Sequence, residues 1–310
     1  MQVCDEACLA YPEWDWIFTT SSSTKIMSLA AYEIAKQRNI PLWLIEPWIE
    51  KVISLLGDRD MEVDTQRFFQ LTVDEYMASC GFTVADDGLA NRHYQSKILA
   101  WRNVTQELIR SPDTETFRNL LRASSFTKNQ PVRIMLHPEM KASTLLQSLE
   151  RNGLLEITQD DDNKISCSIS YESAHFLIGD WLAFYIWDEV TKMGFANDCR
   201  WDFRITNGEA QFEIDLAIAY KTRLLIAECK DAPYTFKDVH LARLHSTANL
   251  LGGNLVSKCF ITSQTGAGDM FKSFCEKARL RNIVVITKED LPTISDILKR
   301  EMIGPKYLRI

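Results

Sequence analysis

Two carboxylates and one ammonium group occur at short spacing in the C-terminal half of the chain. Asp215 is followed after twelve residues by Glu228-Cys-Lys230. A hard cation such as Mg²⁺ or Mn²⁺ takes carboxylate oxygens as ligands and leaves positions open for water and phosphate. A neighbouring lysine can orient water or neutralise charge that develops on the phosphate. This combination is typical of metal-dependent phosphodiester hydrolysis, and we predict Asp215, Glu228 and Lys230 as catalytic residues.

The residues around this group predict two adjacent strands. Strand patterns cover residues 212–220 and 224–230, and the polar segment 221–223 forms a turn between them. Because strand side chains alternate between faces, Glu213 shares a face with Asp215, and the glutamate and lysine of Glu-x-Lys share a face of the second strand. The alternative is an edge strand on which Glu-x-Lys, a common pattern, is a solvated ion pair without a catalytic role.

The flanking segments predict an α/β layer around these strands. Hydrophobic patterns and turn residues indicate a helix over about 174–193, a helix containing His240 and Leu251, a strand over 256–262, a helix over about 270–280, a strand over 282–286 and a short helix from Lys288. The predicted order is helix, three strands, helix, strand, followed by a further helix and strand. This order places the three catalytic candidates at the mouth of a central hairpin.

These residues resemble the PD-(D/E)xK restriction-endonuclease-like nucleases. More narrowly, the segments that resemble the CARF-domain nucleases of type III CRISPR systems are Phe176-Leu-Ile-Gly-Asp-Trp-Leu182, Glu213-Ile-Asp215, Glu228-Cys-Lys230, Leu251-Gly-Gly253 and Lys277-Ala-Arg279. A thinner similarity covers residues 16–27, where the family's sensor domain usually has Thr-Gly-Gly-Thr-Lys. The resemblance implies a sensor domain, a small winged-helix-like connector and a C-terminal nuclease domain of αβββαβ order.

The resemblance also implies a metal site. Asp215 and Glu228 would hold Mn²⁺ or Mg²⁺, and Glu213 or Asp180 would complete the ligands. The family has a glutamate where this chain has Ala183, and Asp180 lies one helical turn earlier on nearly the same face. Asp180 is therefore a candidate replacement ligand. The equally weighted alternative is an aspartate that the helix dipole favours in a first turn.

The N-terminal region predicts a partial Rossmann-like (CARF) domain. Strands are expected over 14–20, 41–46 and 51–56, with a helix over 24–37 after a hydroxyl-rich loop. The residues of that loop that would bind a cyclic oligoadenylate activator are Ser22, Ser23, Thr24 and Lys25. The alternative is a helix cap beside an exposed lysine, because serines replace the family's glycines. The chain also begins too late for the first strand of a complete CARF domain, so the sensor is expected to be shortened.

We predict three regions along the chain. Residues 1–110 form the sensor and dimerisation domain, and residues 171–310 form the nuclease. Residues 111–170 form the connector, with helix, short strand, helix and a hairpin that turns at Asp160-Asp-Asp-Asn163. Three carboxylates at that turn would repel a phosphate backbone, so we interpret the winged-helix pattern as a structural connector rather than a DNA reader.

Composition limits the remaining function classes. The net charge of −7 and a pI near 5.4 argue against a general duplex-binding protein. Eight cysteines without CxxC spacing fit reduced thiols of a cytoplasmic protein, and no signal peptide or membrane span is evident. His240 and His245 are five residues apart, which does not suit a zinc pair. Basic residues that are candidates to line the cleft are Arg200, Arg204, Lys237, Arg243 and Lys272.

The sequence thus predicts a metal-dependent endonuclease. By resemblance, the substrate is single-stranded DNA or RNA and the active form is a homodimer. One alternative is a catalytically impaired nucleotide-sensing regulator that uses the nuclease fold as a scaffold, which the alanine at position 183 and the shortened sensor favour. Another is a repair or restriction-type duplex endonuclease with an unrelated N-terminal domain.

Overall fold

The computed structural model describes residues 6, 9–11, 16–19, 25–46, 51–57, 70–86, 97–111, 114–124, 127, 130–161, 164–231, 236–253 and 256–304. The chain divides into two compact units, Met1–Gln70 and Leu71–Ile310. Each unit contains its own sheet or sheets, so the predicted α/β class is confirmed.

The first unit is a small sheet with one helix. Its elements are β1 (Phe18–Thr19), α2 (Lys25–Arg38), β2 (Leu42–Glu46) and β3 (Lys51–Leu56). β1 and β2 are parallel and joined through α2, while β3 pairs with β2 in antiparallel fashion. Ile34 and Ala35 of α2 are buried together with Leu42 of β2. The strand–helix–strand order predicted from the sequence is confirmed. The predicted ligand residues Ser22, Ser23 and Thr24 lie outside the described residues, as does the side chain of Lys25.

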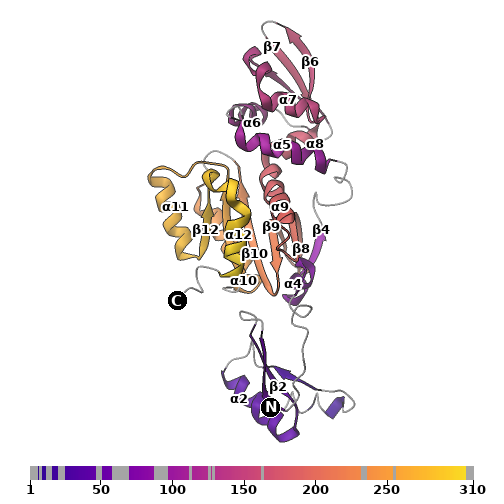
Figure 1. Cartoon of the computed structure of the whole chain (residues 1–310), viewed down its shortest axis with the longest axis vertical. Helices are drawn as coiled ribbons and strands as arrows, with labels where there is room; N and C mark the ends of the chain where they lie inside the picture. The colour runs from indigo at the N-terminus through magenta and orange to yellow at the C-terminus, as the bar shows by residue number, and fades with distance from the viewer. Residues whose placement is uncertain are drawn as a thin grey trace. The chain divides into compact units, whose positions relative to one another are not determined.

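The second unit is built on a six-stranded mixed sheet (Figure 1). In spatial order its strands are β12 (Ile283–Ile286), β11 (Val256–Thr262), β10 (Arg223–Lys230), β9 (Gln211–Tyr220), β8 (Asp198–Thr206) and β4 (Thr83–Asp86). The strands from β4 to β10 pair antiparallel, and β10, β11 and β12 run parallel. Residues 224–229 of β10 are all buried, as expected for a central strand covered on both faces.

Helices cover both faces of this sheet. One face packs against α9 (Trp181–Met193) and α12 (Ile294–Ile303). The other face packs against α4 (Val73–Ser79), α10 (Asp238–Leu250) and α11 (Gly268–Leu280). The 3-10 turn Lys288–Thr293 leads from β12 into α12. The strands that carry the predicted catalytic residues therefore lie in the middle layer of a three-layer unit.

The helix predicted over about 174–193 is interrupted. It consists of α8 (Tyr171–His175), a π-helical turn over Phe176–Asp180 and then α9. A π-helical turn widens the helix by one residue and is common at functional sites. Periodicity alone predicted one continuous helix, because residues 181–186 are all apolar and buried, so the sequence has no polar face there that would reveal the shift from one inserted residue.

The boundary between the two units differs from the prediction. Thr72 and Glu75 form a capping box at the start of α4, which packs beside β4, β8 and β9. β4 then pairs with β8 at the edge of the nuclease sheet. The unit boundary therefore lies at Gln70, and not near residue 110, because this helix and strand complete the larger sheet.

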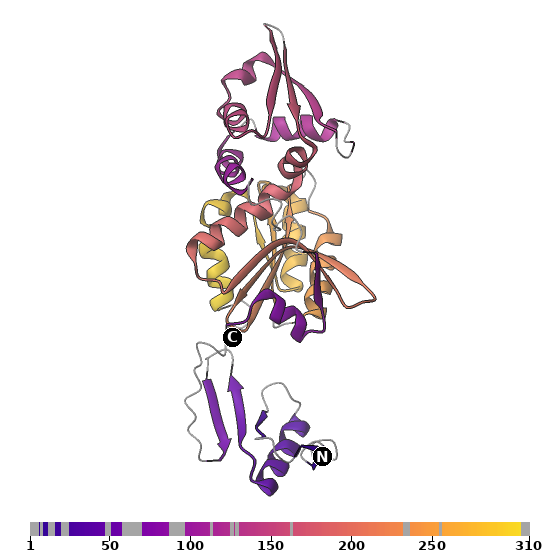
Figure 2. The ribbon, with the colours of Figure 1, turned by 90° about the vertical axis from the view of Figure 1, so that its right-hand side faces the viewer.

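A winged-helix-like arrangement lies at one end of α9 (Figure 2). Its elements are α5 (Ile98–Arg110), α6 (Thr114–Ala123), β5 (Val132–Leu136), the 3-10 turn Pro138–Ala142, α7 (Thr144–Arg151), β6 (Glu156–Asp161) and β7 (Lys164–Ile169). The small sheet has the order β5-β7-β6. Trp101 of α5 stacks on Phe176 with ring centroids 4.3 Å apart, so the connector and the nuclease share one core. Among the described residues, no helix has the length and apolar character needed to cross a membrane.

Candidate active site

The three predicted catalytic side chains converge at the ends of β9 and β10. The Nζ of Lys230 lies 2.9 Å from Oδ2 of Asp215 and 3.0 Å from Oε1 of Glu228. Asp215 also accepts a hydrogen bond of 2.8 Å from the backbone N–H of Cys229. The antiparallel register explains this convergence. Leu216 pairs with Ala227, so the next position along each strand brings the two carboxylates opposite one another.

Helix α10 contributes two groups that the sequence did not assign to the carboxylates. Arg243 binds Glu228 in a bidentate manner, with Nη2 at 2.5 Å from Oε1 and Nε at 3.2 Å from Oε2. The Nδ1 of His240 lies 3.4 Å from Oε1 of Glu228. His240 and Arg243 are three residues apart, which places both on the face of α10 that meets the sheet. Arg243 was predicted only as one of several cleft residues, and His240 was not predicted at all.

Burial and like charge perturb the protonation of this group. Burial, followed by the charge of Glu228, raises the pKa of Asp215, although Lys230 opposes the shift. Burial is also the largest influence on Lys230 and favours its neutral form, but the attraction of Asp215 and Glu228 together outweighs it and raises the pKa of Lys230. Burial lowers the pKa of His240. These shifts favour the charged ammonium of Lys230 and the neutral imidazole of His240.

The site opens into a pocket of about 400 Å³. Asp215 and Lys230 line it together with the predicted ligands Glu213 and Asp180 and with Ala183, the position where the family has glutamate. Asp180 accepts a hydrogen bond of 2.8 Å from Nδ1 of His175. All four predicted metal ligands thus lie near this end of the sheet, but Asp180 is engaged by a histidine of α8.

The residues present suit a hard cation held by two carboxylates. A cavity of about 10 Å³, room for one water-sized species, is lined by Glu213, Asp215, Glu228 and Arg243 among others. Within the described part of the chain, no three histidine, cysteine, aspartate or glutamate side chains are gathered closely enough to hold a metal ion. Mg²⁺ commonly uses one or two carboxylates and completes its shell with water and substrate phosphate, so the carboxylate pair fits this mode of binding.

A buried network fixes the end of β10 directly beside the site. The carboxylate of Asp231, whose side chain is 0% exposed, accepts hydrogen bonds from Arg118, Trp181 and Ser263. Arg122 donates to the backbone carbonyl of Asp231 and also lines the pocket. Both arginines belong to α6, so the connector supplies a cationic side chain to the nuclease pocket. Burial raises the pKa of Asp231, and Arg118 is the main group that opposes this shift.

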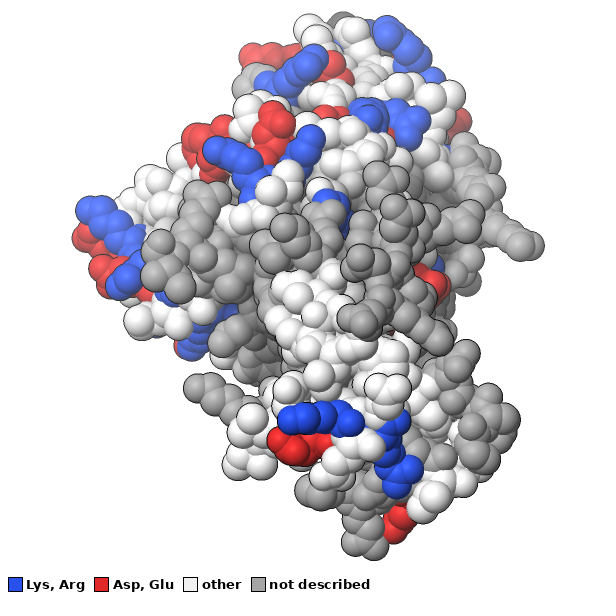
Figure 3. All heavy atoms as spheres, turned by 60° about the horizontal axis from the view of Figure 1, so that its bottom comes forward, with Lys and Arg blue, Asp and Glu red and all other residues white. Residues whose placement is uncertain are grey.

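The remaining basic candidates contribute unequally. Arg204 faces Glu213 in the β8–β9 register and is exposed near the site. Arg200 binds Asp74 at 2.6 Å, at the other end of β8, and Lys272 pairs with the exposed Asp269. On the face drawn in Figure 3, acidic and basic side chains of the described residues are interspersed. The positive charge of the site is therefore local and comes from β10, α10 and α6.

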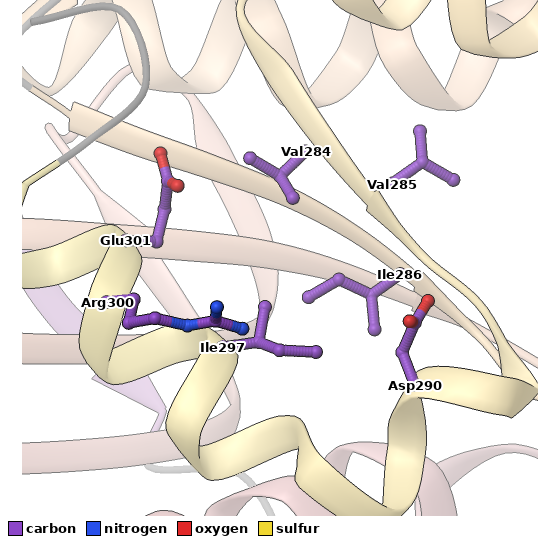
Figure 4. Close-up of a pocket in the computed structure, with 7 residues that line it drawn as sticks. All are labelled: Val284, Val285, Ile286, Asp290, Ile297, Arg300 and Glu301. Carbon is purple, nitrogen blue, oxygen red and sulfur yellow. The ribbon is translucent and has the colours of Figure 1, made fainter. Parts of the chain in front are cut away.

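A separate pocket of about 280 Å³ lies between β12 and α12 (Figure 4). Its lining includes Val284, Ile286, Asp290, Ile297 and Arg300, and none of the predicted catalytic residues. Asp290 accepts the backbone N–H of Thr287 in a capping box, so its carboxylate serves the start of the turn before α12. The charges that can perform phosphodiester chemistry lie at the other pocket, which we treat as the site.

Comparisons with known proteins agree with this arrangement. Residues 170–303 match the model of the family described as "Card1-like, endonuclease domain". No curated protein matches the chain. Among solved structures, protein VC1899 from Vibrio cholerae is similar with a TM-score of 0.72 at 18% identity, over 97% of this chain and 78% of the other. Can2 from Sulfobacillus thermosulfidooxidans in complex with cyclic tetra-adenylate is similar with a TM-score of 0.65 at 19% identity, over 97% and 80% of the two chains.

The family match spans α8 to α12 and contains every predicted catalytic residue. At 18–19% identity, the two structural matches show a shared fold. The predicted resemblance is thereby confirmed for residues 170–303, which match a Card1-like endonuclease domain.

Proposed function

We propose that this protein is a metal-dependent nuclease that hydrolyses phosphodiester bonds of single-stranded DNA, RNA or both. The observation that supports it most strongly is the contact of one ammonium group, Lys230 Nζ, with both Asp215 and Glu228. The two carboxylates at the end of the central hairpin can act as metal ligands. The lysine ammonium between them can stabilise the charge of a phosphate. The Card1-like endonuclease domain supports the same activity.

Mn²⁺ or Mg²⁺ is the cofactor that this donor set favours. Asp215 and Glu228 would hold the ion, with Glu213 and Asp180 as further carboxylates at the pocket. The ion would lower the pKa of water and neutralise phosphate charge. Lys230 would remain beside the carboxylates and hold a phosphate oxygen or orient the attacking water. The half-exposed Arg243 would turn from Glu228 toward the substrate, because its long side chain reaches solvent from α10.

Regulation by a cyclic oligoadenylate is part of the proposal. Can2, which has a similar fold over 97% of this chain, was solved in complex with cyclic tetra-adenylate. The candidate ligand loop of this chain is the hydroxyl-rich segment from Ser22 to Lys25 before α2. We further propose that residues 1–70 act as sensor, that the connector transmits the signal through α6, and that the active form is a cytoplasmic homodimer.

The decisive experiment is a cleavage assay with labelled single-stranded DNA and RNA. Wild-type protein is incubated with Mn²⁺ or Mg²⁺, with and without cyclic tetra-adenylate or cyclic hexa-adenylate. Cleavage is expected to require the metal and to fall at least about 100-fold in Glu228→Gln and Lys230→Ala, because each removes a charge that acts on the transition state.

A matched control for Lys230→Ala is Lys272→Ala. Lys272 is an exposed lysine on α11 whose only described partner is Asp269, so its loss changes the net charge equally but leaves the site intact. Lys272→Ala should cleave at the wild-type rate. Undiminished cleavage by both Glu228→Gln and Lys230→Ala would remove the proposed roles of these residues.

The second candidate is a nucleotide-sensing regulator that uses the nuclease fold as a scaffold. Ala183 in place of a glutamate, together with the ion pair between Arg243 and Glu228, favours it. Calorimetry with Mn²⁺ separates the two functions. Binding that disappears in Asp215→Asn supports the nuclease, whereas an absence of Asp215-dependent binding supports the scaffold.

A further inference from the structure

A second hollow adjoins the catalytic pocket and has a different chemical character. Its volume is about 340 Å³, and it is lined by Arg122, Tyr171, His175, Ile178 and Gly179. Arg122, Ile178 and Gly179 also line the catalytic pocket. Two hollows that share three lining residues are neighbouring parts of one groove. The catalytic part is rich in carboxylates, whereas the lining of the second part contains two aromatic rings, an aliphatic side chain and a guanidinium.

We propose that this second hollow is a subsite for an unpaired nucleobase of the substrate strand, next to the phosphodiester that is cleaved. The proposal rests on the nuclease function proposed above and specifies its substrate. Stacking on aromatic side chains is the general way in which proteins bind single-stranded nucleic acid without reading its sequence. A base within a duplex is stacked and paired, so it would have to leave the helix to enter this hollow.

The local backbone creates the hollow. Tyr171 and His175 lie one turn apart on α8, with ring centroids 6.1 Å apart and planes tilted by 36°. The π-helical turn that follows carries Ile178 and Gly179. An added side-chain carbon at Gly179 would meet no atom within 4 Å, so the glycine leaves open space between the two parts of the groove.

Two polar side chains position a nucleotide in this space. The hydrogen bond between Nδ1 of His175 and the carboxylate of Asp180 fixes the orientation of the imidazole. Arg122 lies at the junction of the two hollows, where a phosphate on the way from the base to Lys230 would pass. Its contacts with the backbone and carboxylate of Asp231 hold it there.

The test compares binding of a normal and an abasic single strand. Fluorescence anisotropy is measured for labelled normal and abasic strands, each as DNA and as RNA. The reference protein is the full-length chain carrying Glu228→Gln, which prevents cleavage. The reference protein should bind the normal strand more tightly than the abasic strand. Tyr171→Ala should weaken binding of the normal strand by about 5- to 150-fold, the range for loss of one base–aromatic stack, and leave the abasic strand unchanged.

Two further variants keep the test decisive if Tyr171→Ala folds poorly. Tyr171→Phe keeps the ring and should bind both strands like the reference protein. Gly179→Leu fills the open space and should remove the preference for the normal strand. Equal affinity of the reference protein for normal and abasic strands overturns the subsite, and so does an equal loss on both strands in Tyr171→Ala.

Failure of the subsite and failure of the nuclease function remain distinguishable. An abasic strand still contains phosphodiester bonds. If protein with an intact Glu228 cleaves it with Mn²⁺ and Glu228→Gln does not, the catalytic assignment stands whatever the outcome at Tyr171. If neither strand is cleaved by any protein, the proposed function itself fails.

Discussion

Replacement of Asp231 with alanine is expected to destabilise the junction between the connector and the nuclease. The carboxylate of Asp231 lies directly after β10 and is fully buried. Its removal leaves the guanidinium of Arg118, whose side chain is 4% exposed, without its buried counter-ion. Among the described residues, the remaining ionic partner of Arg118 is Glu115 on the same helix, and the side chain of Glu115 is 42% exposed.

The expected size of the effect follows from this geometry. Removal of one partner of a buried ion pair costs about 3–5 kcal/mol, because the other charge stays buried without compensation. For a unit of the size of Leu71–Ile310, 1 kcal/mol corresponds to a change in Tm of about 2–4 °C. Asp231→Ala should therefore lower the Tm of this unit by roughly 6–20 °C.

Differential scanning calorimetry of the full-length protein measures this change. Glu115→Ala is the control, since it removes a mainly solvent-exposed partner of the same arginine and should cost at most about 1 kcal/mol. The double variant Arg118→Met/Asp231→Leu removes both charges and should recover much of the loss.

A small effect of Asp231→Ala, equal to that of Glu115→Ala, would refute the reasoning. It would mean that solvent reaches Arg118 and that the pair contributes little to the junction. A double variant that is less stable than Asp231→Ala would also contradict it, because the cost would then arise from lost packing and not from an uncompensated charge.

Two further predictions concern buried ionisable groups. Burial and the charge of Glu228 raise the pKa of Asp215 above its ordinary value of 3.8. As the solution is acidified, the Mn²⁺ affinity measured by calorimetry should therefore begin to fall while the pH is still above 3.8. An affinity that stays constant down to about pH 4 would contradict this. Lys258 of β11 is 1% exposed, and its Nζ has no hydrogen-bond partner within the described chain. Lys258→Met should therefore raise the free energy of unfolding, measured by denaturant titration, by about 1–3 kcal/mol. A decrease would show that the ammonium of Lys258 has a hydrogen-bond partner.

Local patterns were sufficient to predict the hairpin of β9 and β10. The alternation in β9 and β10 fixes which side chains share a face, and the polar turn between the strands fixes their register. Asp215, Glu228 and Lys230 therefore had to meet if the hairpin formed, and their contacts in the structure agree with this prediction. The α/β class followed from the same kind of periodicity, which depends only on neighbours in sequence.

The connections between distant segments were not predictable in this way. β4 occupies the edge of the nuclease sheet although more than a hundred residues separate it from β8 along the chain. A short strand pattern does not specify which sheet it will join, since any free edge offers the same backbone hydrogen bonds. The predicted boundary near residue 110 was wrong for this reason.

The sequence by itself determined the hairpin and the chemistry of its three charged side chains. Only the tertiary structure decided what surrounds them: Arg243 and His240 from α10, and Arg118 and Arg122 from α6. An arginine on an amphipathic helix looks the same in sequence whether it faces water or a buried carboxylate. Its partner is selected by the packing of whole helices against the sheet, which depends on many weak contacts summed over the fold.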